Sequence, residues 1–455
     1  MNVDLELVRK YNVPGPRYTS YPPATQFTDS LPVERIEESI RRNNESPRDL
    51  SLYFHIPFCE SLCWFCGCTT IITLDHRRSG AYVERLGREM ATMARRLHPE
   101  RQVVQLHFGG GTPTFLPPDQ IRRLGELIHR HFRLAEDVEA GVEVDPRRLT
   151  KDHLRALREI GFNRASMGVQ DNNPVVQKAV HRIQPLELTR QAVEWMRELG
   201  FKSINIDLIY GLPHQTVDSF RQTLEEIIAL QPDRYAVFSY AHVPWMKPAQ
   251  KILENREHLP SAETKLQLLK LTIERLEAAG YRYIGMDHFA REDDELAVAQ
   301  REGTLQRNFQ GYSTRGGADI YAFGMSSISQ TPDAYWQNHK ELPAYEADVD
   351  AARLPYARGY ILTEDDHIRR ATIMQIMCNL RIDYAEMSRR LGVDFQEYFA
   401  RELESLGDLE ADGLIRRTAA GFEVTGTGRL LVRIIAMRFD AYLPKQVVRR
   451  HAMTI

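Results

Sequence analysis

Cys59-Glu-Ser-Leu-Cys63-Trp-Phe-Cys66-Gly-Cys68 places four cysteines within ten residues. The first three thiols, at x3 and x2 spacing, can ligate three irons of a [4Fe–4S] cube and leave the fourth iron without a protein ligand. An iron with an open position can bind a substrate or a cofactor directly. The stretch therefore predicts an iron–sulfur centre of this open kind.

Three other uses of these cysteines explain the pattern less well. Structural zinc sites usually take ligand pairs from two separate segments, and the one further cysteine is the distant Cys378. Disulfides form in oxidising compartments, whereas the chain opens Met-Asn-Val-Asp-Leu-Glu, without the basic and apolar regions of a secretory signal. Four unrelated buried thiols would explain such a density poorly.

The residues around the cysteines resemble a known family. The spacing C-x3-C-x2-C after an expected strand is similar to the signature of radical S-adenosylmethionine (SAM) enzymes. The wider sequence resembles oxygen-independent coproporphyrinogen III oxidases, and this likeness extends over essentially the whole chain. It is carried by Tyr53-Phe-His55-Ile-Pro57-Phe-Cys59, Cys63-Trp-Phe65-Cys66-Gly-Cys68, Pro16-Arg17-Tyr18-Thr19-Ser20-Tyr21-Pro22, Gly109-Gly110-Gly111-Thr112-Pro113-Thr114 and Arg307-Asn308-Phe309-Gln310-Gly311-Tyr312.

The resemblance implies a fold, a reaction and cofactors. The fold is an incomplete (β/α)6 barrel. The cofactors are a [4Fe–4S] cluster held by Cys59, Cys63 and Cys66, and two SAM molecules. An electron from the reduced cluster cleaves SAM, and the 5′-deoxyadenosyl radical takes hydrogen from a propionate of coproporphyrinogen III. Loss of CO2 and an electron leaves a vinyl group, and two such conversions give protoporphyrinogen IX for haem biosynthesis.

Composition limits the partners and the compartment. The chain has 455 residues, enough for one large and one smaller domain. Its net charge of −3 gives no global basic field for nucleic acid or an anionic membrane. No stretch approaches the roughly 20 apolar residues of a membrane span. We expect a cytoplasmic monomer that receives electrons from a flavodoxin- or ferredoxin-like donor and passes electrons to an unidentified acceptor.

Short apolar runs alternate with segments of helical periodicity, which predicts a parallel α/β sheet with helices outside. Thr150 is expected to cap a helix that buries Leu154, Leu157 and Ile160 and ends at Gly161. Similar helices are expected before Gly200 and around residues 220–228. The expected strands are Ser51–Pro57, Val103–Phe108, Val138–Val144, Arg164–Val169, Ser203–Tyr210 and Tyr235–Val243.

Three regions are expected along the chain: residues 1–45, 46–365 and 366–455. The prolines of the first region break regular structure, so an ordinary wrapped leader is expected, whereas the resemblance implies a lid over the active site. The last region is expected to be helical, with Ile373, Ile376, Met377 and Leu380 on one buried face and Cys378 beside it. A small β-ribbon around residues 413–426 gives it a winged-helix character, and we expect it to cover the barrel mouth.

Chemically informative residues follow the expected strands, where loops of parallel α/β barrels gather. The glycines before Thr112 allow a backbone to approach a ligand closely, although a tight turn explains them equally well. Glu143 suits ribose hydroxyls or an ammonium group, and Asp145 suits a helix cap better. Asp207 lies in an apolar strand and should therefore have a partner or a ligand.

Site residues are carried over from the resemblance position by position. Tyr53 and Cys68 are the candidate catalytic residues, although the role of Cys68 stays open because it cannot ligate an iron that must bind SAM. Asn308, Gln310 and Arg315 are candidates for the substrate region. The implied SAM-binding residues are Tyr53, Phe65, Gly110, Gly111, Thr112, Glu143, Gln170, Arg182, Asp207, Ala241 and Ile328.

Three rival functions remain on the sequence alone. A haem-binding or haem-delivery protein could use the same scaffold, but such relatives are expected to lack Cys68, the Pro16–Pro22 segment and the Asn308 segment. A radical SAM enzyme could act on another substrate. A nucleic-acid regulator is opposed by the net charge of −3.

Overall fold

The chain is described here by a computed structural model that covers residues 3–256 and 259–443. A large sheet has the strand order β16-β15-β14-β13-β1-β4-β5-β6-β7-β8-β10-β9. The consecutive strands from β13 to β8 are parallel. The six expected strands are confirmed as β1 (Leu50–Ile56), β4 (Gln102–Gly110), β5 (Arg133–Val144), β6 (Arg164–Gln170), β7 (Ser203–Tyr210) and β8 (Arg234–Ser239).

One predicted boundary is wrong, because β8 ends at Ser239 and not at Val243. The backbone N–H of Val243 donates to Oε1 of Gln250 in the following loop. Val243 therefore does not take part in the backbone hydrogen bonds of the sheet. This loop continues through α9 (Lys251–Arg256). The departure from the sheet places residues 240–250 beside the cysteine-rich loop, where Nε2 of Gln250 donates to the carbonyl of Phe65.

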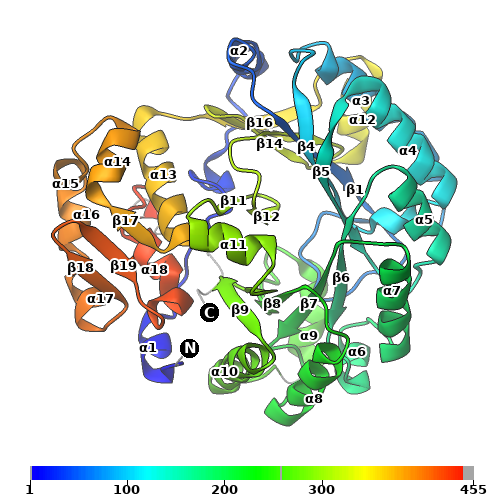
Figure 1. Ribbon diagram of the computed structural model, residues 1–455. Helices are drawn as coiled ribbons and strands as arrows, with labels where there is room; N and C mark the ends of the chain where they lie inside the picture. Colours follow the sequence, from blue (N-terminus) through cyan, green and yellow to red (C-terminus); the bar gives the residue numbers. More distant parts are fainter. Residues whose placement is uncertain (1–2, 257–258, 444–455) are drawn as a thin grey trace.

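Amphipathic helices cover the outer face of the parallel strands (Figure 1). Thr150 forms the predicted cap of α5 through a capping box with His153, and Leu154 and Leu157 are buried. Gly161 ends this helix with a positive φ of 104°. The covering helices are α3 (Arg77–Ala94), α4 (Pro118–His131), α5 (Lys151–Glu159), α6 (Pro174–Ala179), α7 (Leu186–Glu198), α8 (Val217–Ile228) and α10 (Ala262–Ala278).

The sheet curves without closing, so the predicted incomplete barrel is confirmed. Short antiparallel strands extend each side of the parallel set, and the sheet ends at β9 on one side and β16 on the other. The added strands are β9 (Tyr281–Gly285), β10 (His288–Arg291), β14 (Ile328–Gln330), β15 (Ala334–Asn338) and β16 (Tyr356–Ile361). Strand β13 (Asp319–Phe323) is the last member of the parallel set and pairs with β1. Helix α12 (Leu342–Asp350) packs against α3.

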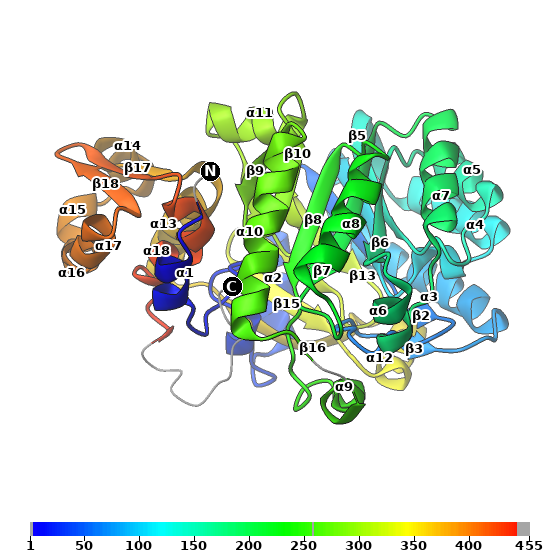
Figure 2. The same cartoon turned by 90° about the horizontal axis from the view of Figure 1, so that it is seen from below.

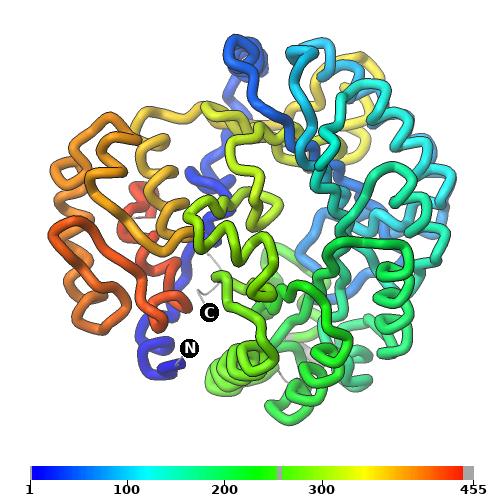
Figure 3. Tube along the Cα trace, viewed as in Figure 1, coloured from blue at the N-terminus to red at the C-terminus, as the bar shows by residue number. Residues whose placement is uncertain are grey.

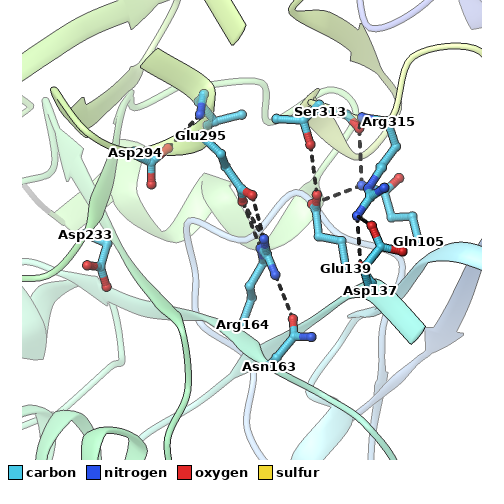
Figure 4. A network of polar contacts seen from close by, with 12 residues as sticks. Gln105, Asp137, Glu139, Asn163, Arg164, Asp233, Asp294, Glu295, Ser313 and Arg315 are labelled. Carbon is cyan, nitrogen blue, oxygen red and sulfur yellow. Dashed lines mark hydrogen bonds and ion pairs between the residues drawn. The ribbon is translucent and has the colours of Figure 1, made fainter. Parts of the chain in front are cut away.

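A network of polar side chains lies across the amino ends of the barrel strands (Figure 4). Arg164 of β6 and Arg234 of β8 both contact Glu295 of α11 (Glu295–Glu302) at 2.6 Å. A two-stranded hairpin, β11 (Gln306–Asn308) and β12 (Gly311–Ser313), lies beside this network. Arg315 after the hairpin contacts Asp137 of β5 at 2.9 Å. The opposite, carboxyl ends of the strands carry the cysteines and the loops.

The C-terminal domain lies beside the barrel (Figure 2) and shares a second hydrophobic core with the N-terminal segment, β9, β10 and α11. The predicted face of Ile373, Ile376, Met377 and Leu380 is buried, as is Cys378. The ribbon is confirmed and gains a third strand, β17. The elements are α13 (Glu364–Asn379), β17 (Arg381–Asp383), α14 (Tyr384–Leu391), α15 (Phe395–Tyr398), α16 (Ala400–Glu404), α17 (Gly407–Ala411), β18 (Ile415–Thr418), β19 (Gly421–Val424) and α18 (Val432–Met437).

The N-terminal segment connects the two parts of the molecule (Figure 3). Helix α1 (Leu5–Tyr11) makes ion pairs with both sides, through Arg9 to Glu263 of α10 and through Lys10 to Asp412. The segment continues along the C-terminal domain, where the Tyr18 hydroxyl donates to Asp440 at 2.9 Å, and reaches α2 (Val33–Asn43) on the barrel. Of the helices within the described ranges, none combines the length and apolar character that crossing a membrane requires.

Candidate functional site

The cysteine-rich loop is held at the carboxyl end of β1. Cys59 ends the short strand β2 (Phe58–Cys59), which pairs in parallel with β3 (Ile71–Ile72). This pairing holds the two ends of the cysteine-rich loop side by side. Cys59, Cys63, Cys66 and Cys68 all line one cavity of about 190 Å³. The sequence spacing therefore brings the three predicted cluster ligands to a common wall.

Hydrogen-bond donors face the sulfur atoms. The Thr112 hydroxyl lies 3.4 Å from Sγ of Cys59, and Arg147 Nη2 and Arg182 Nη1 each donate to Sγ of Cys63 at 3.5 Å. The backbone N–H of Cys68 donates to Sγ of Cys66 at 3.4 Å. Such donors stabilise anionic sulfur, so this cysteine set fits a thiolate-ligated iron–sulfur cluster.

The thiols differ in how readily they lose a proton. The Cys68 thiol donates a hydrogen bond to the Cys66 sulfur, which lowers the pKa of Cys66 to about 6 and raises the pKa of Cys68. Burial raises the pKa of Cys59 to about 11. Cys66 therefore loses its proton more readily than Cys68 does.

Asp145 and two arginines form a buried charged group behind Cys63. Arg182 Nη1 lies 3.2 Å from Oδ2 of Asp145, and Arg147 Nη2 lies 2.6 Å from the same oxygen. Burial raises the pKa of Asp145, but Arg182 and Arg147 outweigh burial and hold the pKa at about 2. The helix-capping interpretation of Asp145 is wrong, because Thr150 caps α5 and Asp145 is used to neutralise both arginines.

The glycine-rich loop after β4 lies against the cysteine loop. Gly110 has a φ of 113°, and a Cβ there would lie 2.7 Å from the His55 ring. A Cβ on Gly111 would lie 2.6 Å from the carbonyl oxygen of Pro57. The backbone N–H of Gly110 donates to Oε2 of Glu143 at 3.2 Å. Side chains are excluded here, so the main chain itself forms part of the cavity wall.

A second cavity, of about 220 Å³, lies in the barrel interior and shares Glu143, Ser166 and Asp207 with the first. Asp207 has the partners expected of a buried carboxylate, since Asn205 donates to it at 2.7 Å and the Ser166 hydroxyl at 3.3 Å. Burial raises the pKa of Asp207 to about 7, and nearby Glu143 acts in the same direction. Asp207 can therefore change its protonation state near neutral pH.

Most of the SAM-binding residues carried over from the resemblance line the first cavity. Tyr53 does not line it, and its hydroxyl lies 3.2 Å from Nδ1 of His55. Ala241 lies exposed in the loop after β8, and Ile328 packs near Phe27. The members of the set that line the cavity, beside the four cysteines of the loop, are Phe65, Gly110, Gly111, Thr112, Glu143, Gln170, Arg182 and Asp207.

Arg147 and Ser166 belong to this cavity but were absent from the sequence-based set. The signal for Arg147 was its position two residues after Asp145 at the end of a strand. The substrate-region candidates lie on or beside the β11–β12 hairpin. Gln310 lines the interior cavity, whereas Arg315 is engaged by Asp137 at the amino ends of the strands.

Comparison with known proteins covers the whole chain. Residues 53–227 match the model of the radical SAM superfamily, and residues 362–431 match the HemN C-terminal domain. An oxygen-independent coproporphyrinogen III oxidase of Pseudomonas aeruginosa is 48% identical over 99% of this chain and 98% of its own length. The Escherichia coli relative of that name is 48% identical over 97% and 95%.

A solved structure gives the same result. Coproporphyrinogen III oxidase (HemN) from Escherichia coli, described as a radical SAM enzyme, superposes with a TM-score of 0.92 at 46% sequence identity. The match covers 97% of this chain and 100% of that one. The likeness therefore includes the barrel, the N-terminal segment and the C-terminal domain.

Proposed function

Because the chain belongs to the oxygen-independent coproporphyrinogen III oxidase family of the radical SAM superfamily, we propose that it converts coproporphyrinogen III to protoporphyrinogen IX without oxygen. Two propionates of the substrate become vinyl groups, each with loss of CO2. The protein is thus an oxidoreductase of haem biosynthesis. The observation that carries this function is the wall of three cysteines whose sulfurs face hydrogen-bond donors, in a chain related to these oxidases over its full length. The relatives named above are oxidases, which favours this function over haem delivery.

When bound, the [4Fe–4S] cluster and SAM supply the radical chemistry that removes hydrogen from a propionate. Cys59, Cys63 and Cys66 would hold the cluster and leave one iron for SAM. The donors at Arg147 and Arg182 stabilise negative charge on Cys63, and Asp145 keeps both guanidinium groups in position. The chain thereby orients the cluster and limits how much uncompensated charge surrounds it.

The first cavity has the groups that a SAM molecule requires. The main chain at Gly110 and Gly111 can approach the methionyl part, and Glu143 and Asp207 can accept hydrogen bonds from ammonium or ribose hydroxyl groups. The proposal includes two SAM molecules. It assigns them Tyr53, Phe65, Thr112, Gln170, Arg182, Ala241 and Ile328 as further contacts, and it gives Tyr53 and Cys68 catalytic roles.

The reaction also requires proteins or molecules that exchange electrons. A flavodoxin- or ferredoxin-like donor supplies the reducing electron, and an acceptor takes the electron released with each CO2. We place the enzyme in the cytoplasm as a monomer with three regions: a leader at residues 1–45, the barrel at 46–365 and the C-terminal domain at 366–455. Residues 1–2, 257–258 and 444–455 of these regions lie outside the described residues.

The test is an anaerobic assay of the reconstituted protein. Reduced enzyme receives SAM and coproporphyrinogen III, and protoporphyrinogen IX, CO2 and 5′-deoxyadenosine are measured together. All three should appear with wild type and disappear with Cys66→Ser. Cleavage of SAM with an unchanged porphyrinogen would show that the substrate is wrong, whereas tight haem binding without turnover would favour a delivery protein.

A further inference from the structure

A third cavity, of about 300 Å³, lies where the N-terminal segment, the barrel and the C-terminal domain meet. It shares no lining residue with the two cavities of the candidate site. Ser20 lines it from the N-terminal segment and Arg307 from β11, while Arg370 of α13 and Arg390 of α14 line it from the C-terminal domain. The cavity therefore exists only when all three parts are docked.

The cavity has an excess of positive charge. Its lining includes Arg48, Arg307, Arg370 and Arg390, but Asp319 is its one acidic residue. Asp319 is engaged elsewhere, because the buried Arg101 binds its Oδ2 and Arg48 lies 3.8 Å from its Oδ1. Among the described residues, Arg307, Arg370 and Arg390 have no carboxylate partner.

Arg307 is the most informative of these arginines. Its residue surface is 6% exposed, and within the described part of the chain neither Nε nor Nη1 has a hydrogen-bond partner. Its guanidinium group lies 4.7 Å from the centre of the Tyr312 ring, which compensates a cation only partly. A buried guanidinium without an anion is unfavourable, so a negatively charged ligand is expected beside it.

Unlike Arg307, the arginines of the candidate site form ion pairs with carboxylates. Arg182 is paired with Asp145, and Arg164 and Arg234 are paired with Glu295. These arginines of the barrel interior and the cysteine loop thus have carboxylate partners. The two neighbouring C-terminal arginines contact neutral oxygens instead, Arg370 the carbonyl of Pro332 at 2.7 Å and Arg390 Oε1 of Gln375 at 3.4 Å. Of all these arginines, those without a carboxylate partner within the described ranges line the third cavity.

We propose that this cavity binds carboxylate groups, and that they are the propionates of the tetrapyrrole that the reaction leaves intact. The guanidinium fork of Arg307 matches a carboxylate in a two-pronged geometry, and several arginines suit more than one carboxylate. The volume accommodates propionate arms but not the macrocycle. Arg307 pairs with Tyr312 across the hairpin and lies against its ring, and Tyr312 lines the barrel interior, so a bound arm lies beside the wall of the cavity that holds Glu143 and Asp207.

This inference rests on the proposed function for the identity of the ligand, but not for its chemistry. A free small polycarboxylate would use the same arginines. Citrate serves as the probe for that source, and coproporphyrinogen III and its fluorescent oxidised form, coproporphyrin III, serve as probes for the tetrapyrrole. The variants are Arg307→Gln and Arg370→Gln, and the matched control is Arg389→Gln, which removes an exposed positive charge next to Arg390 without lining the cavity.

The reconstituted holoenzyme is assayed anaerobically. Loss of a charge-assisted hydrogen bond at Arg307 should raise KM for coproporphyrinogen III, and Kd for coproporphyrin III, by about ten- to a hundredfold. The turnover number kcat should change less, because the arm binds away from the cysteines. Arg307→Lys should restore part of the affinity, since it keeps the charge without the fork, and Arg389→Gln should behave as wild type.

The outcomes separate the inference from the function on which it rests. Arg307→Gln removes an unpaired buried charge, so its thermal midpoint should not fall; if it does not fold, the exposed Arg390→Gln repeats the measurement. An unchanged KM in active Arg307→Gln, together with no Arg307-dependent thermal shift by citrate, overturns the inference. If citrate raises the thermal midpoint only when Arg307 is present, but Arg307→Gln leaves KM for coproporphyrinogen III unchanged, the cavity binds carboxylates and the tetrapyrrole is not its ligand. If wild type never converts the porphyrinogen, the proposed function fails while the citrate measurement still tests the cavity.

Discussion

The contact of Arg182 with both Asp145 and Cys63 allows its two effects to be separated by mutation. Arg182 is 7% exposed, and its Nη1 lies 3.2 Å from Asp145 and 3.5 Å from Sγ of Cys63. The two arginines around Asp145 lower the pKa of this carboxyl from 3.8 to about 2, against the opposing effect of burial. At 1.36 kcal/mol per pKa unit, the carboxylate is stabilised by about 2 kcal/mol at neutral pH.

The sign of this effect follows from the lowered pKa. Stability from the ionised Asp145 is present above the unfolded value of 3.8 and is lost as the pH falls through about 2. At pH 7 the full contribution is present, and because Arg147 supplies part of it, Arg182→Gln should destabilise the apoprotein by at most about 2 kcal/mol. A double-mutant cycle with Asp145→Asn, followed by urea unfolding at pH 7, measures how much of this loss belongs to the pair.

The second effect, the hydrogen bond from Arg182 to the Cys63 sulfur, is measured by iron binding. In the Asp145→Asn background, Arg182→Gln no longer breaks the ion pair but still removes a donor from the Cys63 sulfur, so iron retained after reconstitution should fall further. Arg122→Gln is the matched control, because Arg122 pairs with Glu159 on the surface at 2.6 Å and such exposed pairs contribute little. If Arg182→Gln were equally destabilising with and without Asp145→Asn, the charge argument for this site would be refuted.

Three further predictions follow from single contacts. Burial raises the pKa of Glu89 from 4.5 to about 7. The neutral form of Glu89 therefore contributes about 3 kcal/mol to the free energy of unfolding. This contribution is complete below about pH 4.5 and is lost as the pH rises through about 7. Glu89→Gln should therefore flatten the change in urea midpoint between pH 5.5 and pH 8, and an unchanged slope would contradict this. In Gly111→Ala the new Cβ would lie 2.6 Å from the Pro57 carbonyl oxygen, so Kd for SAM should rise at least about tenfold with iron content retained; unchanged binding in calorimetry would argue against close approach of this main chain. Cys66→Ser should lose the bound iron whereas Cys68→Ser should keep it, as measured by iron content, and equal loss in both variants would make Cys68 a ligand.

The sequence predicts the central part of the fold because its signals are local. Six apolar runs and the helices between them are long enough to show their periods, and Thr150 and Gly161 mark the ends of one helix correctly. The strands at the sheet edges were not predicted. Strands such as β14 (Ile328–Gln330) have three residues and give less than two alternations. Their positions depend on pairing with distant strands, which no local pattern records.

In the candidate site, too, the features with a local sequence signal were predicted and those that depend on distant residues were not. The cysteine spacing and the glycines before Thr112 are local, and the structure gathers them on one cavity. Asp145 was misinterpreted because its partners are Arg147, two residues away, and Arg182, which arrives from a loop after another strand. Arg315 is a sequence-based candidate for the substrate region, but the sequence does not distinguish this arginine, which Asp137 engages, from Arg307, which has no carboxylate partner among the described residues. That distinction depends on tertiary contacts.

The distribution of these pairs explains why the barrel can remain open and still offer a defined site. Ion pairs at Glu295 and Asp137 hold α11 and the hairpin across the amino ends of the strands (Figure 4). With that end closed, the polar interior cavity meets the cysteine-lined cavity at the carboxyl ends, through Glu143, Ser166 and Asp207. A completely closed small barrel would fill its interior with side chains. Leaving the sheet open at β9 and β16 keeps space for ligands, and the ion pairs at the amino ends replace the rigidity that closure would have provided.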